Sequence, residues 1–224
     1  MTATIVITGA NRGIGLEMTR QAAARGDRVF ALCRDPARMP ALAGAVTVVA
    51  ADVVDEASLA AAARAVDGPI DLLVCNAGML EGRGGIDDPA FSAAGWQRSL
   101  MTNVAGPFLT VRAFHSGLKR AAAPRVAIIA SVMGSTARAN GAALSYRASK
   151  AAAVNLAVNL AKALAGDGIA VGAYHPGWVR TDMGGAGADI EASDSAAGLL
   201  ARFDRLDMAS SGVFEDYKGA AIPY

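Results

Sequence analysis

Short apolar runs rich in β-branched residues recur along the chain, and longer stretches without glycine or proline lie between them. The first pattern is typical of buried strands and the second of helices. Gly26 and Gly166 follow two of the longer stretches, where glycine commonly ends a helix. The predicted strands are 3–7, 28–33, 46–50, 71–75, 125–130, 169–174 and 213–217, and the predicted helices are 16–25, 58–66, 96–120, 145–165 and 194–206.

Strands therefore alternate with helices from one end of the sequence to the other. This order predicts an α/β fold with a doubly wound parallel sheet of the Rossmann type and helices on both faces. No linker, repeat or low-complexity tract interrupts the pattern, so we expect residues 1–224 to form a single domain. Gly106 and Pro107 predict a kink within 96–120. Residues of about 182–195 lack periodicity and predict a short, mobile loop beside the substrate.

Composition narrows the classes of protein that the sequence can represent. With 224 residues and 53% hydrophobic residues, the chain can bury one large core. The net charge of +1 and the lack of a basic cluster argue against nucleic-acid binding. We expect no membrane segment, no signal peptide and a cytoplasmic location. Cys33 and Cys75 are expected to be reduced core thiols, and His115 and His175 have no ligand-like partners, so we expect no metal site.

A glycine-rich segment joins the first predicted strand to the first predicted helix. Glycine allows a tight turn there and leaves room for a ligand against the backbone. The unpaired N–H groups of the helix's first turn favour an anion, most often the pyrophosphate of a dinucleotide. A tight turn that binds nothing is the alternative, which the flanking strand and helix make weaker. The predicted binding residues of this turn are Gly9, Asn11, Arg12, Gly13, Ile14 and Gly15.

Tyr146 and Lys150 are four residues apart and therefore share one face of a predicted helix. A nearby ammonium and the positive end of the helix dipole would both lower the pKa of the phenol. Tyr146 would then act as a general acid or base near neutral pH. Ser131, at the end of the preceding strand, could hold a substrate oxygen in the same cleft. Taken alone, the pair could be two unrelated residues on an exposed face, and Ser131 a turn residue.

In order, these motifs are Thr8-Gly9-x-x-x-Gly13-x-Gly15, Asn76-Ala77-Gly78, Asn103, Ser131, Tyr146-x-x-x-Lys150 and Pro176-Gly177-x-x-x-Thr181. As an ordered set they resemble the short-chain dehydrogenase/reductase family, and the resemblance spans the chain from residue 4 to the tail. The stretch from His175 to Gly184 is similar to the branch that contains the bacterial C-factor and small carbonyl reductases.

The resemblance implies a role for each motif residue. Tyr146 would exchange a proton with the substrate oxygen, Lys150 would lower its pKa and bind the nicotinamide ribose, and Ser131 would orient the substrate. Asn103 would hold the long helix and a proton-relaying water. The further cofactor-binding residues that it implies are Asp52, Val53, Asn76, Ala77, Gly78, Pro176, Gly177, Val179 and Thr181. Cys75 departs from the family pattern, in which a second asparagine often precedes Asn76.

The end of the second predicted strand indicates which nicotinamide cofactor is used. Members of the family that bind NAD usually carry an acidic residue there, which bonds the ribose 2′-hydroxyl. In this sequence the position falls on Cys33, and Arg34 follows it. Arg12 and Arg34 could converge on a 2′-phosphate, although Asp35 could compete if the register shifts. We therefore predict a preference for NADP(H) over NAD(H).

The substrate is predicted from the candidate wall residues, which are mostly apolar, and the sequence indicates no charged residue that awaits a carboxylate or phosphate. A small apolar carbonyl or alcohol compound is the favoured class. Two alternatives remain: a C-factor-like signalling or cofactor-binding protein with little turnover, and, more weakly, an isomerase or epimerase of nucleotide sugars. The two long helices predict a homodimer or homotetramer. The candidate wall residues are Met79, Leu80, Val132, Met133, Trp178 and Met183.

Overall fold

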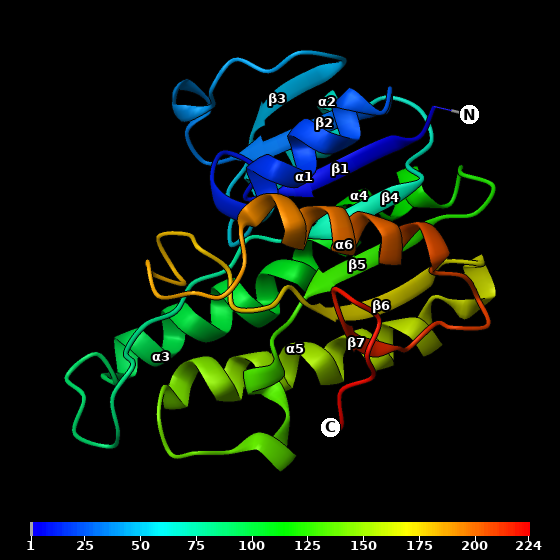
Figure 1. Ribbon diagram of the computed structural model, residues 1–224. Helices are drawn as coiled ribbons and strands as arrows, with labels where there is room; N and C mark the ends of the chain where they lie inside the picture. The colour runs from blue at the N-terminus through cyan, green and yellow to red at the C-terminus, as the bar shows by residue number, and fades with distance from the viewer. Residues whose placement is uncertain (1) are drawn as a thin grey trace.

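A computed structural model describes residues 2–224, and its seven strands form one sheet (Figure 1). All six pairings between neighbouring strands are parallel. The strands lie in the order β3-β2-β1-β4-β5-β6-β7. They are β1 (Thr4–Thr8), β2 (Arg28–Cys33), β3 (Val46–Ala50), β4 (Leu72–Cys75), β5 (Arg125–Ile129), β6 (Ala170–His175) and β7 (Phe214–Asp216).

The strand order reverses at the boundary between β1 and β4. From β1 the chain proceeds outward through β2 to β3, and then returns to the other side of β1 to form β4. Connections on the two sides therefore leave the carboxyl ends of β1 and β4 in opposite directions, which opens a crevice there. The predicted doubly wound parallel sheet is confirmed.

Helices cover both faces of the sheet. Helices α1 and α6 pack side by side on one face, and α2, α4 and α5 lie on the other (Figure 1). The helices are α1 (Gly13–Ala24), α2 (Glu56–Ala65), α3 (Ala93–Leu100), α4 (Gly106–Leu118), α5 (Leu144–Ala163) and α6 (Ala192–Arg205). Short helical turns are η1 (Pro36–Arg38), η2 (Met101–Ala105), η3 (Val132–Gly134), η4 (Thr136–Arg138) and η5 (Ala165–Asp167).

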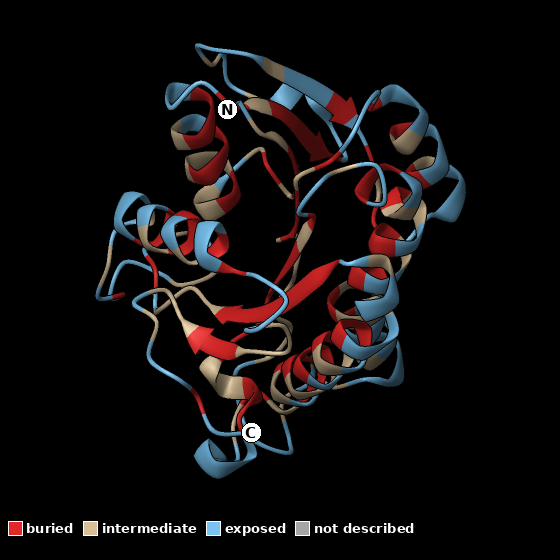
Figure 2. Cartoon of the chain, turned by 90° about the vertical axis from the view of Figure 1, so that its right-hand side faces the viewer, coloured by how far each residue is buried: buried red, intermediate tan, exposed pale blue. Residues whose placement is uncertain are grey.

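The alternation of side chains along each strand divides the core into two apolar layers. In β4, Leu72 and Val74 pack with α1 and α6, whereas Leu73 and Cys75 pack with the helices of the other face. Both kinds of position are apolar because a parallel sheet is buried on both faces. Figure 2 shows the result: the central strands are buried, the edge strand β3 is largely exposed, and the helices are buried on their inner sides.

The predicted helix 96–120 differs from the structure in an informative way. It consists of α3, a π-helical turn η2 and α4. The expected kink at Gly106 and Pro107 is instead a turn just before them, in which the Gly106 N–H donates to the carbonyl of Met101, five residues back. Pro107 has no N–H to continue the regular ladder, which accounts for the wider turn. The turn carries Asn103 into the interior.

Two other boundaries are corrected. Helix α1 begins at Gly13, three residues before the prediction, because the glycines themselves form its first turn. The loop expected over about 182–195 ends earlier than predicted: residues 182–189 are turns without helix or strand, Ile190 forms a parallel bridge with Val179, and α6 begins at Ala192. Within residues 2–224, no helix is long and apolar enough to cross a membrane.

The glycine-rich turn is packed so closely that one of its glycines cannot carry a side chain. A Cβ atom on Gly15 would lie 2.3 Å from the Gly9 carbonyl oxygen and 2.5 Å from Asn76 Nδ2. The atom nearest to such a Cβ belongs to the backbone, so the helix would have to move away from the strand. Gly15 therefore sets the distance between α1 and β1.

We expect Gly15→Ala to lower the free energy of unfolding by about 1–3 kcal/mol, because the overpacked backbone cannot relax locally. Gly166→Ala is the matched control, since nothing lies within 4 Å of the added methyl group. Urea unfolding of both variants measures the difference. Equal stability of the two variants would contradict the packing argument.

Candidate active site

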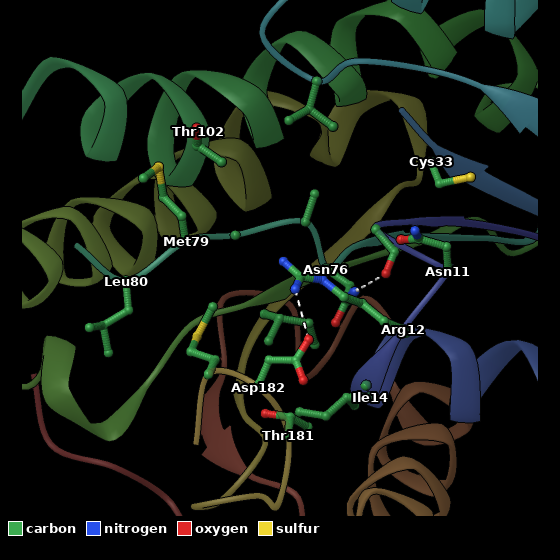
Figure 3. A pocket seen from close by; sticks show the side chains of 18 of the residues that line it. Asn11, Arg12, Ile14, Cys33, Asn76, Met79, Leu80, Thr102, Thr181 and Asp182 are labelled. Carbon is green, nitrogen blue, oxygen red and sulfur yellow. Dashed lines mark hydrogen bonds and ion pairs between the residues drawn. The ribbon is translucent and has the colours of Figure 1, made fainter. Parts of the chain in front are cut away.

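A cavity of about 830 Å³ lies at the carboxyl ends of the strands, in the crevice opened by the reversal of strand order. Its wall includes the glycine-rich turn, the ends of β2 and β4, the start of α5 and the segment after β6 (Figure 3). Tyr146 and Lys150 line the same cavity as the glycine-rich turn. The fold thus brings residues more than 130 positions apart in the sequence to one site.

Most of the predicted site residues line this cavity, and four do not. The residues outside its wall are Asn103, Ser131, Gly177 and Val179. Asn103 and Ser131 make hydrogen bonds with the backbone of Met79 and Met133, and Gly177 and Val179 pack against Ile190 in the segment after β6. The predicted residues that line it are Gly9, Asn11, Arg12, Gly13, Ile14, Gly15, Arg34, Asp52, Val53, Asn76, Ala77, Gly78, Tyr146, Lys150, Pro176 and Thr181.

The amino end of α1 faces the cavity without a partner from a side chain. Its N-cap residue, Arg12, makes no side-chain capping bond, and its first turn contains no acidic residue. Gly9 and Gly13 have φ angles of +64° and +55°, which favour glycine. The unpaired N–H groups and the helix dipole together suit an anion. This part of the cavity therefore fits the pyrophosphate of a dinucleotide.

Thr8 and Asn76 join β1 to β4 where the two strands separate. The Thr8 hydroxyl oxygen accepts bonds from the backbone N–H groups of Asn76 (3.0 Å) and Ala77 (3.1 Å). The Asn76 amide donates to the carbonyls of Thr8 (2.9 Å) and Gly9 (3.2 Å). These bonds replace the sheet ladder beyond its last pair, so the floor of the cavity keeps its shape.

Gly78 leaves room for a flat ligand to lie against the backbone after β4. A Cβ atom there would come within 3.3 Å of Asn103 Oδ1 and 3.5 Å of Lys150 Nζ. A larger residue would therefore crowd the polar groups at the centre of the site. The glycine keeps this wall thin, as close approach of a nucleotide requires.

Asn103 connects three segments from within the π-helical turn. Only 1% of it is exposed. Its amide accepts from the Met79 N–H (2.9 Å) and donates to the Met79 carbonyl (2.9 Å) and to Ser149 Oγ (2.9 Å). The Ser149 hydroxyl in turn donates to the Tyr146 carbonyl (2.8 Å). Asn103 therefore fixes the helix that carries Tyr146 relative to the segment after β4.

Lys150 is buried and reaches across to the sheet. Its ammonium donates to the Ile129 carbonyl at 2.7 Å and lies 5.7 Å from the centre of the Tyr146 ring. Burial lowers the pKa of Lys150 to about 8. The ammonium is thus held in place by a strand end, with its remaining N–H groups free to bind a ligand.

The predicted decrease in the pKa of Tyr146 is wrong for the protein alone. Burial raises this pKa to about 12, although a hydrogen bond with Ser131 and the charge of Arg83 oppose the rise. The reason is that the phenolate would have to form out of water, and this cost exceeds the help from its neighbours. Tyr146 is consequently a protonated phenol at neutral pH.

The end of β2 carries a cation that faces the cavity and an acid that does not. Cys33 and Arg34 line the cavity. The Asp35 carboxylate instead accepts from the Ala37 N–H at 3.1 Å and caps the turn η1. Its predicted competition for this position is therefore not supported by its geometry. The local charge favours an anion.

Arg12 and Arg34 both line the cavity, but Arg12 is already paired with an acid. It forms an ion pair with Asp182 at 2.9 Å, between the glycine-rich turn and the segment after β6 (Figure 3). The two side chains are 65% and 78% exposed, so the pair contributes little to stability. The acid that pairs with Arg12 comes from a distant part of the chain, which no local motif indicates.

The predicted substrate wall is only half correct. Met79, Leu80 and Met183 line the cavity, whereas Val132, Met133 and Trp178 do not. The sequence indicates no charged residue awaiting a carboxylate or phosphate, but Arg83 also lines the cavity and its charge acts on Tyr146. Arg83 stands in a loop without a recognisable motif, and only its sign of charge could have suggested a role. Among residues 2–224, no cluster of His, Cys, Asp or Glu is placed to hold a metal ion.

Comparison with known protein families identifies the family of this chain. The sequence model of the short chain dehydrogenases matches residues 3–190. The chain belongs to this family. That match includes the glycine-rich turn, Asn103, Ser131, Tyr146 and Lys150, which the structure assembles around one crevice.

Three relatives illustrate the range within this short-chain dehydrogenase/reductase family. The C-signal of Myxococcus xanthus is 40% identical over 159 residues, which are 70% of this chain and 94% of that protein. The 1-hydroxy-2-glutathionyl-2-methyl-3-butene dehydrogenase of a Rhodococcus strain is 31% identical over 99% of both chains. A solved structure of NADPH-bound carbonyl reductase from chicken fatty liver is 32% identical, with a TM-score of 0.90 over 100% of this chain and 99% of the other.

Burial of Lys150 has a consequence for stability. The pKa of Lys150 is about 8 in the folded protein against 10.5 for an ordinary lysine. The unfolded chain therefore holds more protons between these two values, and this group makes the protein more stable as pH rises through that window. At neutral pH the buried charge opposes folding.

We expect Lys150→Met to raise the free energy of unfolding at pH 7 by about 1–3 kcal/mol, despite the lost bond to Ile129. The variant should also lose the increase in stability between about pH 8 and pH 10.5. Urea unfolding at pH 7 and pH 10 measures both effects. Lys162→Met, on the exposed side of the same helix, is the control. A less stable Lys150→Met protein at pH 7 would contradict the argument.

Proposed function

We propose that the protein is an NADP(H)-dependent oxidoreductase that moves a hydride between the nicotinamide and a small carbonyl or alcohol substrate. The observation that carries this proposal is one continuous cavity with an anion-binding helix end, Tyr146 and Lys150 in its wall. A protein that only binds nucleotides has no need for the buried phenol and ammonium. We further propose that the sheet and its helices act as a single domain.

The residues that would hold the cofactor follow from their positions. The amino end of α1 would bind the pyrophosphate, Arg34 a 2′-phosphate, and Asp52 and Val53 the adenine. Lys150 would bind the ribose next to the nicotinamide, with Pro176 and Thr181 on the opposite wall. When bound, the nicotinamide supplies or accepts the hydride.

The protein's own chemistry concerns one proton. Tyr146 is a protonated phenol at neutral pH, because burial raises its pKa to about 12. A substrate oxygen held by Tyr146 could accept that proton as negative charge develops on it. Ser131, just outside the cavity wall, would steady the Tyr146 hydroxyl through their hydrogen bond. Lys150 lies beside the ring and favours the negative phenolate that remains. The protonated phenol is the form that carbonyl reduction requires.

The preference for NADP(H) is supported by charge at the end of β2. Arg34 lines the cavity without an acidic partner among the described residues, and Asp35 is occupied by its capping bond. A 2′-phosphate would gain a charge-assisted bond there. The chicken carbonyl reductase, which is 32% identical, was crystallised with NADPH. This likeness supports the same cofactor for the present chain.

A second candidate is a signalling or cofactor-binding protein with little turnover. The observation in its favour is the 40% identity to the C-signal of Myxococcus xanthus over most of that protein. Against it stands the arrangement around Tyr146, whose neighbours Lys150 and Asn103 are held by specific hydrogen bonds. Turnover in solution distinguishes the two candidates.

We also propose that copies of the chain associate through the outer face of α3, η2 and α4. Leu100, Met101 and Phe108 on this face are 40%, 39% and 41% exposed. Apolar side chains of this size in one region are typical of an interface. This assignment agrees with the homodimer or homotetramer expected from the long helices.

We expect Tyr146→Phe to lower kcat/KM for NADPH-dependent reduction of simple ketones by about 10²–10⁴-fold, since the substrate oxygen loses its proton donor. NADPH oxidation followed by its absorbance measures this loss. Tyr217→Phe removes a hydroxyl from a tyrosine outside the cavity wall and is the control. If wild type and Tyr146→Phe show the same low rate with every ketone, the signalling candidate is favoured.

We expect Arg34→Asp to shift the ratio of catalytic efficiencies from NADPH towards NADH by at least about tenfold, because a carboxylate repels the 2′-phosphate and can bond a hydroxyl. Arg38→Asp makes the same charge change in the nearby turn η1, outside the cavity wall. A wild-type enzyme with no preference, or one that favours NADH, would refute the assignment.

A further inference from the structure

Five arginines line the cavity, and most of them are neutralised by acids. Arg12 pairs with Asp182, Arg98 with Glu81, and Arg180 with Glu191. Each of these three cations is balanced before any ligand arrives. The other two arginines, Arg34 and Arg83, have no carboxylate partner in the part of the chain that the structure describes.

The two unbalanced arginines stand in different parts of the cavity. Arg34 follows β2 and is accounted for by the phosphate of the proposed cofactor. Arg83 belongs to the loop between β4 and α3, and its charge reaches Tyr146. A second unbalanced cation therefore faces the end of the cavity at which the reaction would occur.

The loop that carries Arg83 is fixed to the body of the protein. The Arg83 and Gly84 N–H groups donate to the Asp88 carboxylate at 3.0 and 2.8 Å. The Gly84 carbonyl accepts from the Ala143 N–H at 3.0 Å, and Ser145 Oγ donates to the Glu81 carbonyl at 3.0 Å. These bonds attach the loop to the start of α5, close to Tyr146 in the sequence. The backbone that carries the exposed Arg83 side chain is thus held in place.

The guanidinium itself keeps most of its donors free. Arg83 Nη2 donates to the Met183 carbonyl, in the segment after β6. A guanidinium has five N–H donors in a planar fork, which matches the two oxygens of a carboxylate. The bond to a neutral carbonyl orients the fork and leaves its charge uncompensated. Met79, Leu80 and Met183 supply apolar wall between this cation and the rest of the site.

We propose that Arg83 binds a carboxylate of the substrate, so that the preferred substrates are small keto acids or the corresponding hydroxy acids. The carbonyl carbon would lie beside Tyr146, the methylene chain along the apolar wall, and the carboxylate on the guanidinium. This inference rests on the proposed oxidoreductase function. It refines the apolar class of substrate to one that is apolar in the middle and anionic at one end.

The test compares keto acids with their methyl esters, which keep the ketone and the carbon chain but lack the negative charge. Levulinate and its longer homologues, each with its ester, are reduced with NADPH by wild type, Arg83→Gln and Arg98→Gln. Arg83→Gln keeps a donor for the Met183 carbonyl but removes the charge. Arg98→Gln removes the same charge from an arginine that is already paired with Glu81.

For at least one chain length, wild type should prefer the acid over its ester by about tenfold or more in kcat/KM, mainly through KM. Arg83→Gln should lose this preference, and Arg98→Gln should keep the acid-to-ester ratio within about twofold. Esters reduced as well as acids by wild type, or an equal loss for both in Arg83→Gln, would overturn the inference while the proposed function stands. No reduction of any acid, ester or simple ketone would instead refute the proposed function.

Discussion

The site depends on the way β1 and β4 part at their carboxyl ends. A parallel sheet would ordinarily leave unpaired backbone groups where two strands diverge, and here Thr8 and Asn76 satisfy them with side-chain hydrogen bonds. Because the floor of the cavity is held by these bonds, the glycine-rich turn can bend sharply on one side. On the other side, the chain after β4 can run towards Asn103 and Tyr146.

The same crevice explains why the candidate reacting groups have unusual acidity. Burial disfavours the charged form of both groups, so the pKa of Tyr146 is raised and the pKa of Lys150 is lowered. Both effects would relax in water. At neutral pH the buried charge of Lys150 is retained at some expense in stability, whereas Tyr146 is neutral in both the folded and unfolded protein. Such an expense is typical of functional sites in which folding and chemistry have different requirements.

The positive charges along the cavity are mostly neutralised within the protein. Most arginines in its wall are paired with acids from other segments, which limits non-specific attraction for anions. The exceptions, Arg34 and Arg83, then become the positions at which a charged ligand can gain most. The proposed cofactor and the proposed substrate therefore share one requirement, an anionic group that binds an arginine without an acidic partner.

The sequence by itself determined the parallel sheet, because strand and helix periodicities alternate so regularly that few other folds could bury them. It also indicated the glycine-rich turn and the pair Tyr146 and Lys150. Each of these motifs lies within a short stretch of the chain, so its geometry follows from the local turn or helix. Tertiary structure decided the rest. The pKa of Tyr146, the pairing of Arg12 with Asp182 and the placement of Arg83 all depend on burial or on partners from distant segments. Electrostatic energies depend on such surroundings, which no local pattern of residues encodes.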